Sequence, residues 1–277
     1  MSRKTPVLNK KNKNTSKYAD LPKLDVPLLD LKEKLDSSML RCEKTTIPHV
    51  SEPDIVRHYI NLSVKNHHVD QDFYPLGSCT MKYNPKINDK IASNANFLDL
   101  HPQQLEKDIQ GTLKLMYELE AMLNSITGMD RTTLQPTAGS QGEFAGLLVM
   151  KKYHKTKKNK KKFILIPETA HGTNPASVIL SGYEVVQVKT DDEGCTDIED
   201  LRSKVNDDVA GMMLTQPNTL GVFERNIVQI AEMIHEVDGL MYMDGANLNA
   251  LLSISRPADM GFDITHMNLH KTFSTPH

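Results

Sequence analysis

The chain has 277 residues and carries 33 Lys and Arg against 35 Asp and Glu, a net charge of −2 at pH 7. This balance argues against a general nucleic-acid or membrane-surface binder, and no apolar run approaches the ~18 residues of a membrane span. The length is sufficient for a large hydrophobic core. The three cysteines, Cys42, Cys79 and Cys195, are widely spaced, which favours neither a disulfide framework nor a zinc site and is typical of a reducing compartment.

The N-terminal region is predicted to be an extended arm. Residues 1–17 are rich in Lys and Asn and lack the apolar core of a secretory signal, whereas a mitochondrial presequence would favour Arg and Ser. We therefore expect a cytoplasmic protein, with the mitochondrial matrix as the alternative. Closely spaced prolines up to Pro53 exclude long helices. The expected division is an arm over residues 1–53 and one large domain over residues 54–277.

A helix and an unusual loop follow the arm. Ser51 can cap the helix, Pro53 suits its first turn, and an apolar stripe begins at Ile55. Residues 73–85, FYPLGSCTMKYNP, then combine aromatic, thiol, hydroxyl and cationic groups with little periodicity. Two interpretations remain open for this loop, an ordered connector or the wall of an active site. Cys79 alone is a weak nucleophile candidate, because no base is evident beside it.

The next segment predicts a helix, a strand and an anion-binding turn. Apolar residues at helical spacing predict a helix over residues 105–126, and Gly128 suits its left-handed C-cap. Residues 132–135 are predicted to form a short strand. The small residues that follow, up to a new helix from Gly142, expose backbone N–H groups at a positive helix end, which favours a phosphate site. A tight turn explains this segment equally well.

The new helix ends in eight lysines between Lys151 and Lys162. A nucleic-acid patch is one interpretation, but Tyr153 is the only aromatic residue among them. The run is predicted to be a solvated helix end.

Beyond the lysines, strands alternate regularly with helices. Strands are predicted over residues 163–166, 184–188, 211–215 and 240–243, helices over 197–205 and 226–237, and Asn174 and Pro175 suit an N-cap and first helical position. This alternation predicts an α/β fold with a parallel, doubly wound sheet that binds ligands at the carboxyl ends of its strands. The polar groups expected at that edge are residues 136–141, His171, residues 216–219, Asp244 and Lys271.

Three of these residues suggest a chemistry. Lys271 follows a short apolar run and is a candidate Schiff-base lysine, although most such lysines are solvated. Asp244 ends an apolar strand, where it either caps the following turn or holds a pyridinium nitrogen protonated. His171 either stacks on a ring or forms a hydrogen bond within its loop. With the anion-binding helix start, these residues describe a fold-type I site for pyridoxal 5'-phosphate (PLP).

Four motifs resemble one family closely. They are the loop at 73–85, AHGTNPA (170–176), DGANLNA (244–250) and NLHKTF (268–273). In this order they resemble the P-protein of the glycine cleavage system, and within that family the second subunit of its two-subunit form. The resemblance runs from about Leu21 to the end of the chain.

The resemblance implies roles for individual residues. Lys271 corresponds to the lysine that binds PLP covalently, Asp244 to the pyridinium partner and His171 to the ring-stacking residue, and these three form the catalytic set. The loop at Cys79 corresponds to a segment lining the pocket. No metal is implied. The cofactor-binding set comprises Lys271, Asp244, His171, Gly139, Ser140, Gln141, Asn247, Thr219 and His270.

The resemblance also implies an activity. The family is a glycine dehydrogenase (decarboxylating) that removes CO₂ from glycine and transfers the aminomethyl group to the lipoyl group of the H-protein. The implied partners are glycine dehydrogenase subunit 1 and the lipoylated H-protein, in a heterotetramer. Family members continue beyond the position of His277 with a glycine-rich loop and a small C-terminal domain. Two alternatives therefore stay open: a truncated subunit that keeps assembly or PLP binding without turnover, and another fold-type I PLP enzyme.

Overall fold

The structure, a computed structural model, describes residues 5–8, 22–43, 48, 50–71 and 82–275. The loop at Cys79 lies almost entirely outside these residues, so its role stays a prediction. The chain forms two compact units, Met1–Tyr74 and Pro75–His277. The expected division into an arm up to residue 53 and one domain after it is likewise still a prediction. No helix among the described residues is long and apolar enough to cross a membrane.

The first unit contains little regular structure. Its described elements are α1 (Leu31–Lys34), the 3₁₀ turn Ser37–Met39 and α2 (Glu52–Ser63). Ser51 caps α2 through its hydroxyl, which accepts from the Asp54 N–H at 3.4 Å, and a proline lies in the first turn. The predicted start of this helix is therefore confirmed.

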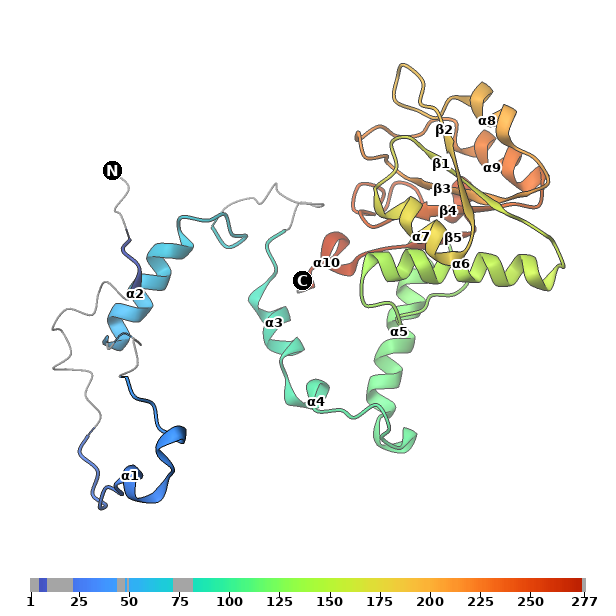
Figure 1. Cartoon of the computed structure of the whole chain (residues 1–277). Helices are drawn as coiled ribbons and strands as arrows, with labels where there is room; N and C mark the ends of the chain where they lie inside the picture. The colour runs from blue at the N-terminus through green and yellow to red at the C-terminus, as the bar shows by residue number, and fades with distance from the viewer. Residues whose placement is uncertain (1–4, 9–21, 44–47, 49, 72–81, 276–277) are drawn as a thin grey trace. The chain divides into compact units, whose positions relative to one another are not determined.

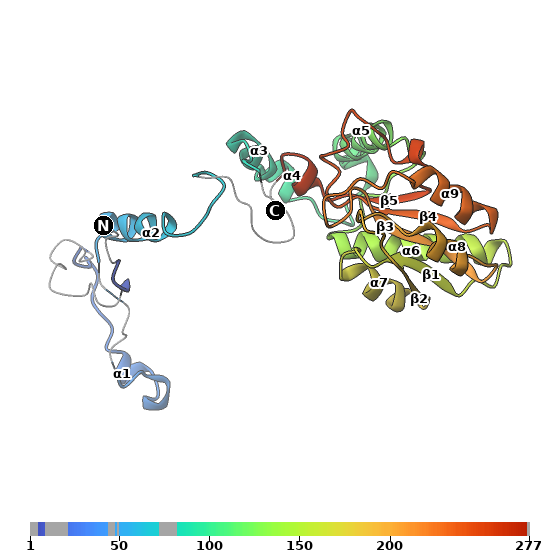
Figure 2. The same ribbon diagram turned by 90° about the horizontal axis from the view of Figure 1, so that it is seen from above.

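The second unit is built on a five-stranded sheet. Its strands are β1 (Phe163–Pro167), β2 (Glu184–Val188), β3 (Val209–Thr215), β4 (Leu240–Asp244) and β5 (Ile264–His266). They lie in the order β2-β1-β3-β4-β5, and every neighbouring pair is parallel. Figure 2 shows this order across the sheet. The predicted parallel sheet is confirmed, and β5 is a strand that the sequence analysis did not predict.

Helices cover both faces of the sheet. On one face lie α6 (Gly139–Thr156) and α7 (Thr173–Ser181), and on the other α8 (Ile198–Lys204) and α9 (Ile227–Glu236) (Figure 1). Two apolar clusters result, one around Leu147, Val178 and Tyr242 and one around Leu201, Ile230 and Met241. Burial on both faces explains why β1, β3 and β4 read as continuous apolar runs, whereas the edge strand β2 exposes Glu184 and Gln187.

The remaining helices are α3 (Lys86–Ala92), α4 (Ala95–Leu98), α5 (Gln110–Thr127) and α10 (Leu269–Thr272), with 3₁₀ turns at Glu106–Asp108 and Ala258–Met260. Gly128 ends α5 with φ +76°, so the predicted left-handed C-cap is confirmed. The predicted start at Leu105 is wrong, because residues 106–108 form a 3₁₀ turn first.

Residues 132–135 do not form a strand, contrary to prediction. Thr132 instead bonds to side chains of α5: its N–H donates to Glu120 Oε1 at 3.4 Å and its hydroxyl to Asn124 Oδ1 at 2.6 Å. Two helix starts also differ from prediction. The α6 helix begins at Gly139 rather than Gly142, and the N-cap of α7 is Gly172 rather than Asn174.

Seven of the eight lysines in the run are exposed, as predicted, Lys161 is half-buried, and several members have local partners. Lys157 and Lys162 pair with Asp238 and Asp208 at 2.7 and 2.9 Å, and Lys151 Nζ donates to the Ser181 carbonyl at 2.7 Å. The run therefore tethers the end of α6 to neighbouring loops.

Candidate active site

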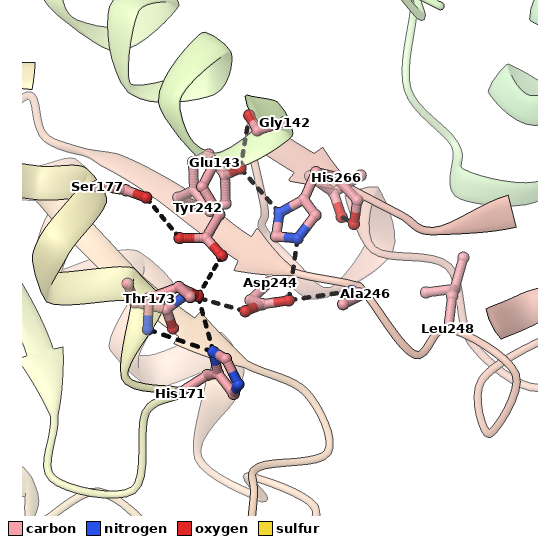
Figure 3. A network of polar contacts seen from close by, with 12 residues as sticks. Gly142, Glu143, His171, Thr173, Ser177, Tyr242, Asp244, Ala246, Leu248 and His266 are labelled. Atoms are coloured by element: carbon pink, nitrogen blue, oxygen red, sulfur yellow. Dashed lines mark hydrogen bonds and ion pairs between the residues drawn. The ribbon is translucent and has the colours of Figure 1, made fainter. Parts of the chain in front are cut away.

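A buried polar cluster lies at the carboxyl edge of the sheet (Figure 3). Asp244 ends β4 and pairs in register with His266, the last residue of β5. Glu143 reaches the cluster from the second turn of α6, and Asn174, Thr173 and Ser177 reach it from the first half of α7. The parallel sheet brings these residues together because the carboxyl ends of its strands share one edge.

Asp244 is held as an anion by its neighbours. Its Oδ2 accepts from Asn174 Nδ2 at 2.9 Å and its Oδ1 from the Ala246 N–H at 3.0 Å, while His266 Nε2 lies 3.2 Å from Oδ1. Burial by itself raises the pKa of the Asp244 carboxyl, but contact with His266 and the hydrogen bonds from Asn174 and Ala246 outweigh it and hold that pKa well below its usual value. Asp244 therefore stays charged at neutral pH.

His266 is itself fixed by a second residue of β4. Tyr242 places its hydroxyl 2.9 Å from His266 Nδ1 and 3.2 Å from the Gly142 carbonyl of α6. Burial raises the pKa of Tyr242 well above its usual value, and the nearby Asp244 carboxylate adds to the effect. The phenol thus stays protonated and locks the imidazole ring beside Asp244.

Glu143 ties the two helices on this face together. Its Oε1 accepts from the Thr173 hydroxyl at 2.6 Å and its Oε2 from the Ser177 hydroxyl at 2.8 Å. The Thr173 hydroxyl also lies 2.7 Å from His171 Nδ1. The carboxylate of α6 is therefore linked through α7 to the ring of His171, which is half-buried.

Glu143, Asp244 and His266 bring potential metal-ligand atoms within 4.8 Å of one another. Each carboxylate oxygen of Glu143 and Asp244 already accepts a hydrogen bond from a protein donor. This arrangement reads as a hydrogen-bonded network, which is the usual way in which buried polar groups are satisfied.

The start of α6 approaches the segment that carries the candidate lysine. A Cβ on Gly139 would lie 2.9 Å from Asn268 Oδ1, an oxygen that is buried without a hydrogen-bond partner in the described structure. No side chain caps this 18-residue helix at Ala138, so its first N–H groups and positive end remain available for an anion. Ser140 is exposed there, and Gln141 bonds back to Thr137, whose N–H and hydroxyl both donate to Gln141 Oε1 at 2.8 Å.

Lys271 lies on the four-residue helix α10, directly after β5. The helix is anchored to the loop after β4, because the Leu248 N–H donates to Thr272 Oγ1 at 3.1 Å and the Asn268 N–H to the Ala246 carbonyl at 3.4 Å. Lys82 Nζ donates to the carbonyl oxygens of Lys271 and, at 3.4 Å, His270. Lys271 is half-buried on a segment tied to the same loop that begins at Asp244.

The remaining predicted residues make no described contact with the polar cluster around Asp244. Asn247 is exposed in the turn after β4. Thr219 is exposed in the turn after β3, where its neighbour Asn218 donates to the Gly194 carbonyl at 2.7 Å. Among the described contacts, none joins Thr219 to Asp244, His171 or Lys271. His270 precedes Lys271 on α10 and is half-buried.

Sequence reasoning missed six residues of the cluster: Glu143, Thr173, Asn174, Ser177, Tyr242 and His266. Asn174 was interpreted as a helix cap, yet it is fully buried and its amide donates to Asp244. His266 had one usable signal, a histidine that follows Ile264 and Thr265 shortly before the candidate lysine. Tyr242 and Glu143 carried none, because their roles depend on packing between α6 and the sheet.

Comparisons with known proteins agree with this architecture. The glycine cleavage system P-protein family matches residues 16–274. A probable glycine dehydrogenase (decarboxylating) subunit 2 from Caldanaerobacter subterraneus subsp. tengcongensis is 56% identical over 96% of this chain and 55% of its own length. The protein of the same description from Chloroherpeton thalassium is 53% identical over 98% of this chain and 55% of its own. The chain thus spans about half the length of the curated relatives that it matches.

Solved structures show the fold. A glycine decarboxylase (P-protein) of the glycine cleavage system, in inhibitor-bound form, matches 87% of this chain and 52% of its own with a TM-score of 0.64 at 17% identity. An aromatic aminotransferase from Pyrococcus horikoshii matches 69% of this chain and 52% of its own with a TM-score of 0.52 at 18% identity. The fold is that of the fold-type I PLP-dependent enzymes. With a family match over nearly its whole length, the chain belongs to the glycine cleavage system P-protein family.

Proposed function

We propose that this chain carries the PLP site of a glycine-decarboxylating P-protein and that Lys271 binds the cofactor covalently. The observation that carries the proposal is a buried, ionised Asp244 at the end of β4, directly before the loop that anchors the lysine-bearing helix α10. A buried charge is costly unless it is paired and hydrogen-bonded, and strongly shifted pKa values cluster at functional sites. Membership in the P-protein family supplies the substrate class, glycine.

The residues present fit PLP. Asp244 accepts hydrogen bonds on both oxygens, yet a carboxylate offers about four acceptor positions, so one can receive the N–H of a protonated pyridine ring. The start of α6 offers N–H groups to a phosphate. Asn268 Oδ1 is buried beside Gly139 and has no hydrogen-bond partner among the described residues. It offers a further acceptor to the cofactor, on the segment that leads to Lys271.

PLP, when bound, supplies an electron-withdrawing ring that takes up the electrons left behind when the carboxylate of glycine departs as CO₂. Asp244 keeps the pyridine nitrogen protonated, which this chemistry requires. His266 and Asn174 hold the Asp244 carboxylate in place, and Tyr242 holds His266. His171 lies at the start of α7, on the side of the cluster reached through Thr173 (Figure 3).

We extend the proposal to the partners of the family. The aminomethyl group would pass to the lipoyl group of an H-protein, and turnover would need a subunit 1, as the description "subunit 2" of the relatives implies. Other fold-type I enzymes, such as aminotransferases, share the fold but not the family match. They are therefore the weaker alternative.

Cofactor loading tests the first part of the proposal. Purified chain incubated with PLP should develop an absorbance band near about 420 nm that borohydride bleaches, and peptide mass spectrometry should place the reduced pyridoxyl group on Lys271. Lys271→Ala should abolish the band, and Lys151→Ala, on the exposed end of α6, should leave it unchanged. Labelling of other lysines with none on Lys271 would refute the assignment.

Turnover tests the second part. Exchange of labelled bicarbonate into glycine, with added lipoylated H-protein and subunit 1, should depend on Lys271. PLP loading without exchange would instead identify this chain as a cofactor-binding subunit that does not turn over.

A further inference from the structure

Three side chains form a continuous line from the interior of the second unit to His171. Glu143, 3% exposed on α6, accepts from the Thr173 hydroxyl at 2.6 Å. The same hydroxyl oxygen lies 2.7 Å from His171 Nδ1. Figure 3 shows this line beside the Asp244 cluster, with Ser177 on the other oxygen of Glu143.

The direction in which the Thr173 hydroxyl donates its proton decides whether His171 Nδ1 carries a hydrogen. A threonine hydroxyl has one proton to donate, and it faces two candidate acceptors at nearly equal distance. Hydrogen bonds to a carboxylate are roughly twice as strong as those between neutral groups, so the proton lies toward Glu143. The oxygen of Thr173 then meets His171 Nδ1 at 2.7 Å as an acceptor, which requires that Nδ1 carry a hydrogen.

One contact competes with this assignment. The backbone N–H of Thr173 lies 3.3 Å from His171 Nδ1 and would favour an unprotonated nitrogen there. That contact is 0.6 Å longer than the hydroxyl contact (3.3 Å against 2.7 Å). It is beyond the usual range of 2.7–3.2 Å for an N–H donor. Two lone pairs facing each other at 2.7 Å would cost more than this weak bond contributes.

We propose that Glu143 is a positioning residue that acts through Thr173 to hold neutral His171 as its Nδ1–H tautomer. The lone pair of the ring is then on Nε2, where it can accept a hydrogen bond from a donor of the ligand. This use of Nε2 rests on the proposed PLP function, whereas the tautomer is a property of the protein alone. Which ring nitrogen carries the proton is set by the bond that the other nitrogen makes.

The tautomer can be observed directly in the full chain without cofactor. Long-range ¹H–¹⁵N correlation spectra of protein labelled with ¹⁵N-histidine distinguish protonated from unprotonated ring nitrogens, and His171→Gln identifies the His171 signals. In alkaline buffer, where imidazole is neutral, we expect Nδ1 protonated and Nε2 unprotonated. The opposite pattern in the parent protein would overturn the proposal, whatever any variant does.

Three variants test the path of the effect. Thr173→Val keeps the branched shape but removes the hydroxyl, and it should convert the His171 signals to the Nε2–H form that free imidazole prefers. Thr173→Ser should retain the parent pattern. Ser177→Ala removes the other hydroxyl on Glu143 and should also retain it, so a conversion in this variant would show that general loosening of Glu143, not the Thr173 path, moves the proton. Thermal unfolding of each variant checks that the fold is intact.

Addition of PLP separates this inference from the proposed function. If PLP loads on Lys271, the Nε2 signal of His171 should shift in parent protein and in Ser177→Ala. Loading with an unchanged Nε2 signal would overturn the ligand-facing role. Failure of PLP to load at all would refute the proposed function, and the tautomer measured without cofactor would still support or overturn the Glu143 path.

Discussion

Asp244 shows how two hydrogen-bond donors and a neighbouring imidazole can keep a buried carboxylate charged. The side chain is buried at the end of an apolar strand, yet an amide, a backbone N–H and an imidazole surround its two oxygens. Because the folded state lowers the pKa of Asp244, the ionised form contributes stability at neutral pH. That contribution is lost as the pH falls through the lowered pKa.

Asp244→Asn should therefore destabilise the protein at neutral pH, by about 1–3 kcal/mol, because an amide places a donor against existing donors. The difference in the free energy of unfolding between parent and variant should shrink as the pH falls below about 5, toward the usual Asp pKa of ~3.9. Urea titrations at several pH values measure it. A difference that stayed constant down to pH ~3 would mean that the pKa of Asp244 is the same in the folded and unfolded protein, and an advantage of the parent that grew as the pH fell would mean that the folded protein keeps this carboxyl neutral.

At this scale the sequence was informative only where a residue's role follows from its position along the chain. Asp244 and His171 were found because strand ends in a parallel sheet face the ligand edge. Glu143 could not be found this way, since the predicted helix starts at Gly142 and an acidic residue next to a helix start is ordinarily explained by the helix dipole. Its bonds to Thr173 and Ser177 join residues 30 and 34 positions apart, and only the packing of α6 on α7 creates them.

At the scale of elements, α6 lies unusually close to the sheet. A Cβ on Gly146 would lie 2.3 Å from Tyr242 Cε2 and 2.9 Å from Ile264 Cγ2. Contacts this short require β4, β5 or α6 to move. The absence of a side chain at Gly146 therefore sets the distance at which Glu143 reaches the carboxyl edge.

Gly146→Ala should lower the free energy of unfolding by about 1–3 kcal/mol through overpacking. Gly111→Ala is the matched control, because Gly111 lies on an exposed part of α5 with no atom within 4 Å of an added Cβ. It should stabilise the protein by up to about 1 kcal/mol, as alanine restricts the unfolded chain. Denaturant unfolding compares the two, and equal effects would contradict the close approach of α6.

The short helix α10 depends on a cation from outside itself. Its last carbonyl groups have no partners within the helix, and Lys82 Nζ donates to those of His270 and Lys271. Helix ends of this polarity favour a positive charge. Lys82 thus fixes the backbone that carries the candidate cofactor lysine.

Lys82→Met keeps the aliphatic stem and removes the charge. PLP loading on Lys271 should therefore weaken roughly tenfold, the equivalent of about 1.5 kcal/mol, which is the lower end for a charged hydrogen bond. Lys86→Met is the control, because Lys86 lies over the ring of Tyr83 at 5.7 Å on the neighbouring helix α3. It should change loading less than about twofold. Equal losses of PLP loading in both variants would show that the effect comes from removing a positive charge in this region and not from the contact of Lys82 with α10.

Elements with a clear apolar run or an apolar period were predicted well, and elements without one were not. The strands β1, β3 and β4 are continuous, mostly buried apolar runs that can be read from the sequence, and the edge strand β2 is recognised by its three valines. The strand β5 has three residues and one of them is His266, so it shows no such run. Residues 132–135 have strand-like composition, but hydrogen bonds to α5 replace sheet pairing.

At the scale of the whole molecule, the two units differ in how they are stabilised. Every buried hydrophobic side chain among the described residues, from Leu123 to Phe262, belongs to the unit Pro75–His277. In the unit Met1–Tyr74, the described residues contribute one buried side chain, His58. Among the described residues, the hydrophobic effect therefore stabilises the second unit and contributes little to the first.

A chain that begins at Pro75 should accordingly unfold cooperatively, with a midpoint within about 2 °C of that of the full chain, because it retains both apolar clusters and the sheet between them. Scanning calorimetry of the two proteins at equal concentration makes the comparison. Hydrogen exchange provides the control within the full chain: amides of β3 and β4 should exchange last and those of α1 first, since local stability follows buried contact. A drop of ~10 °C in the shortened chain would show that residues before Pro75 stabilise the sheet through contacts other than a buried apolar core.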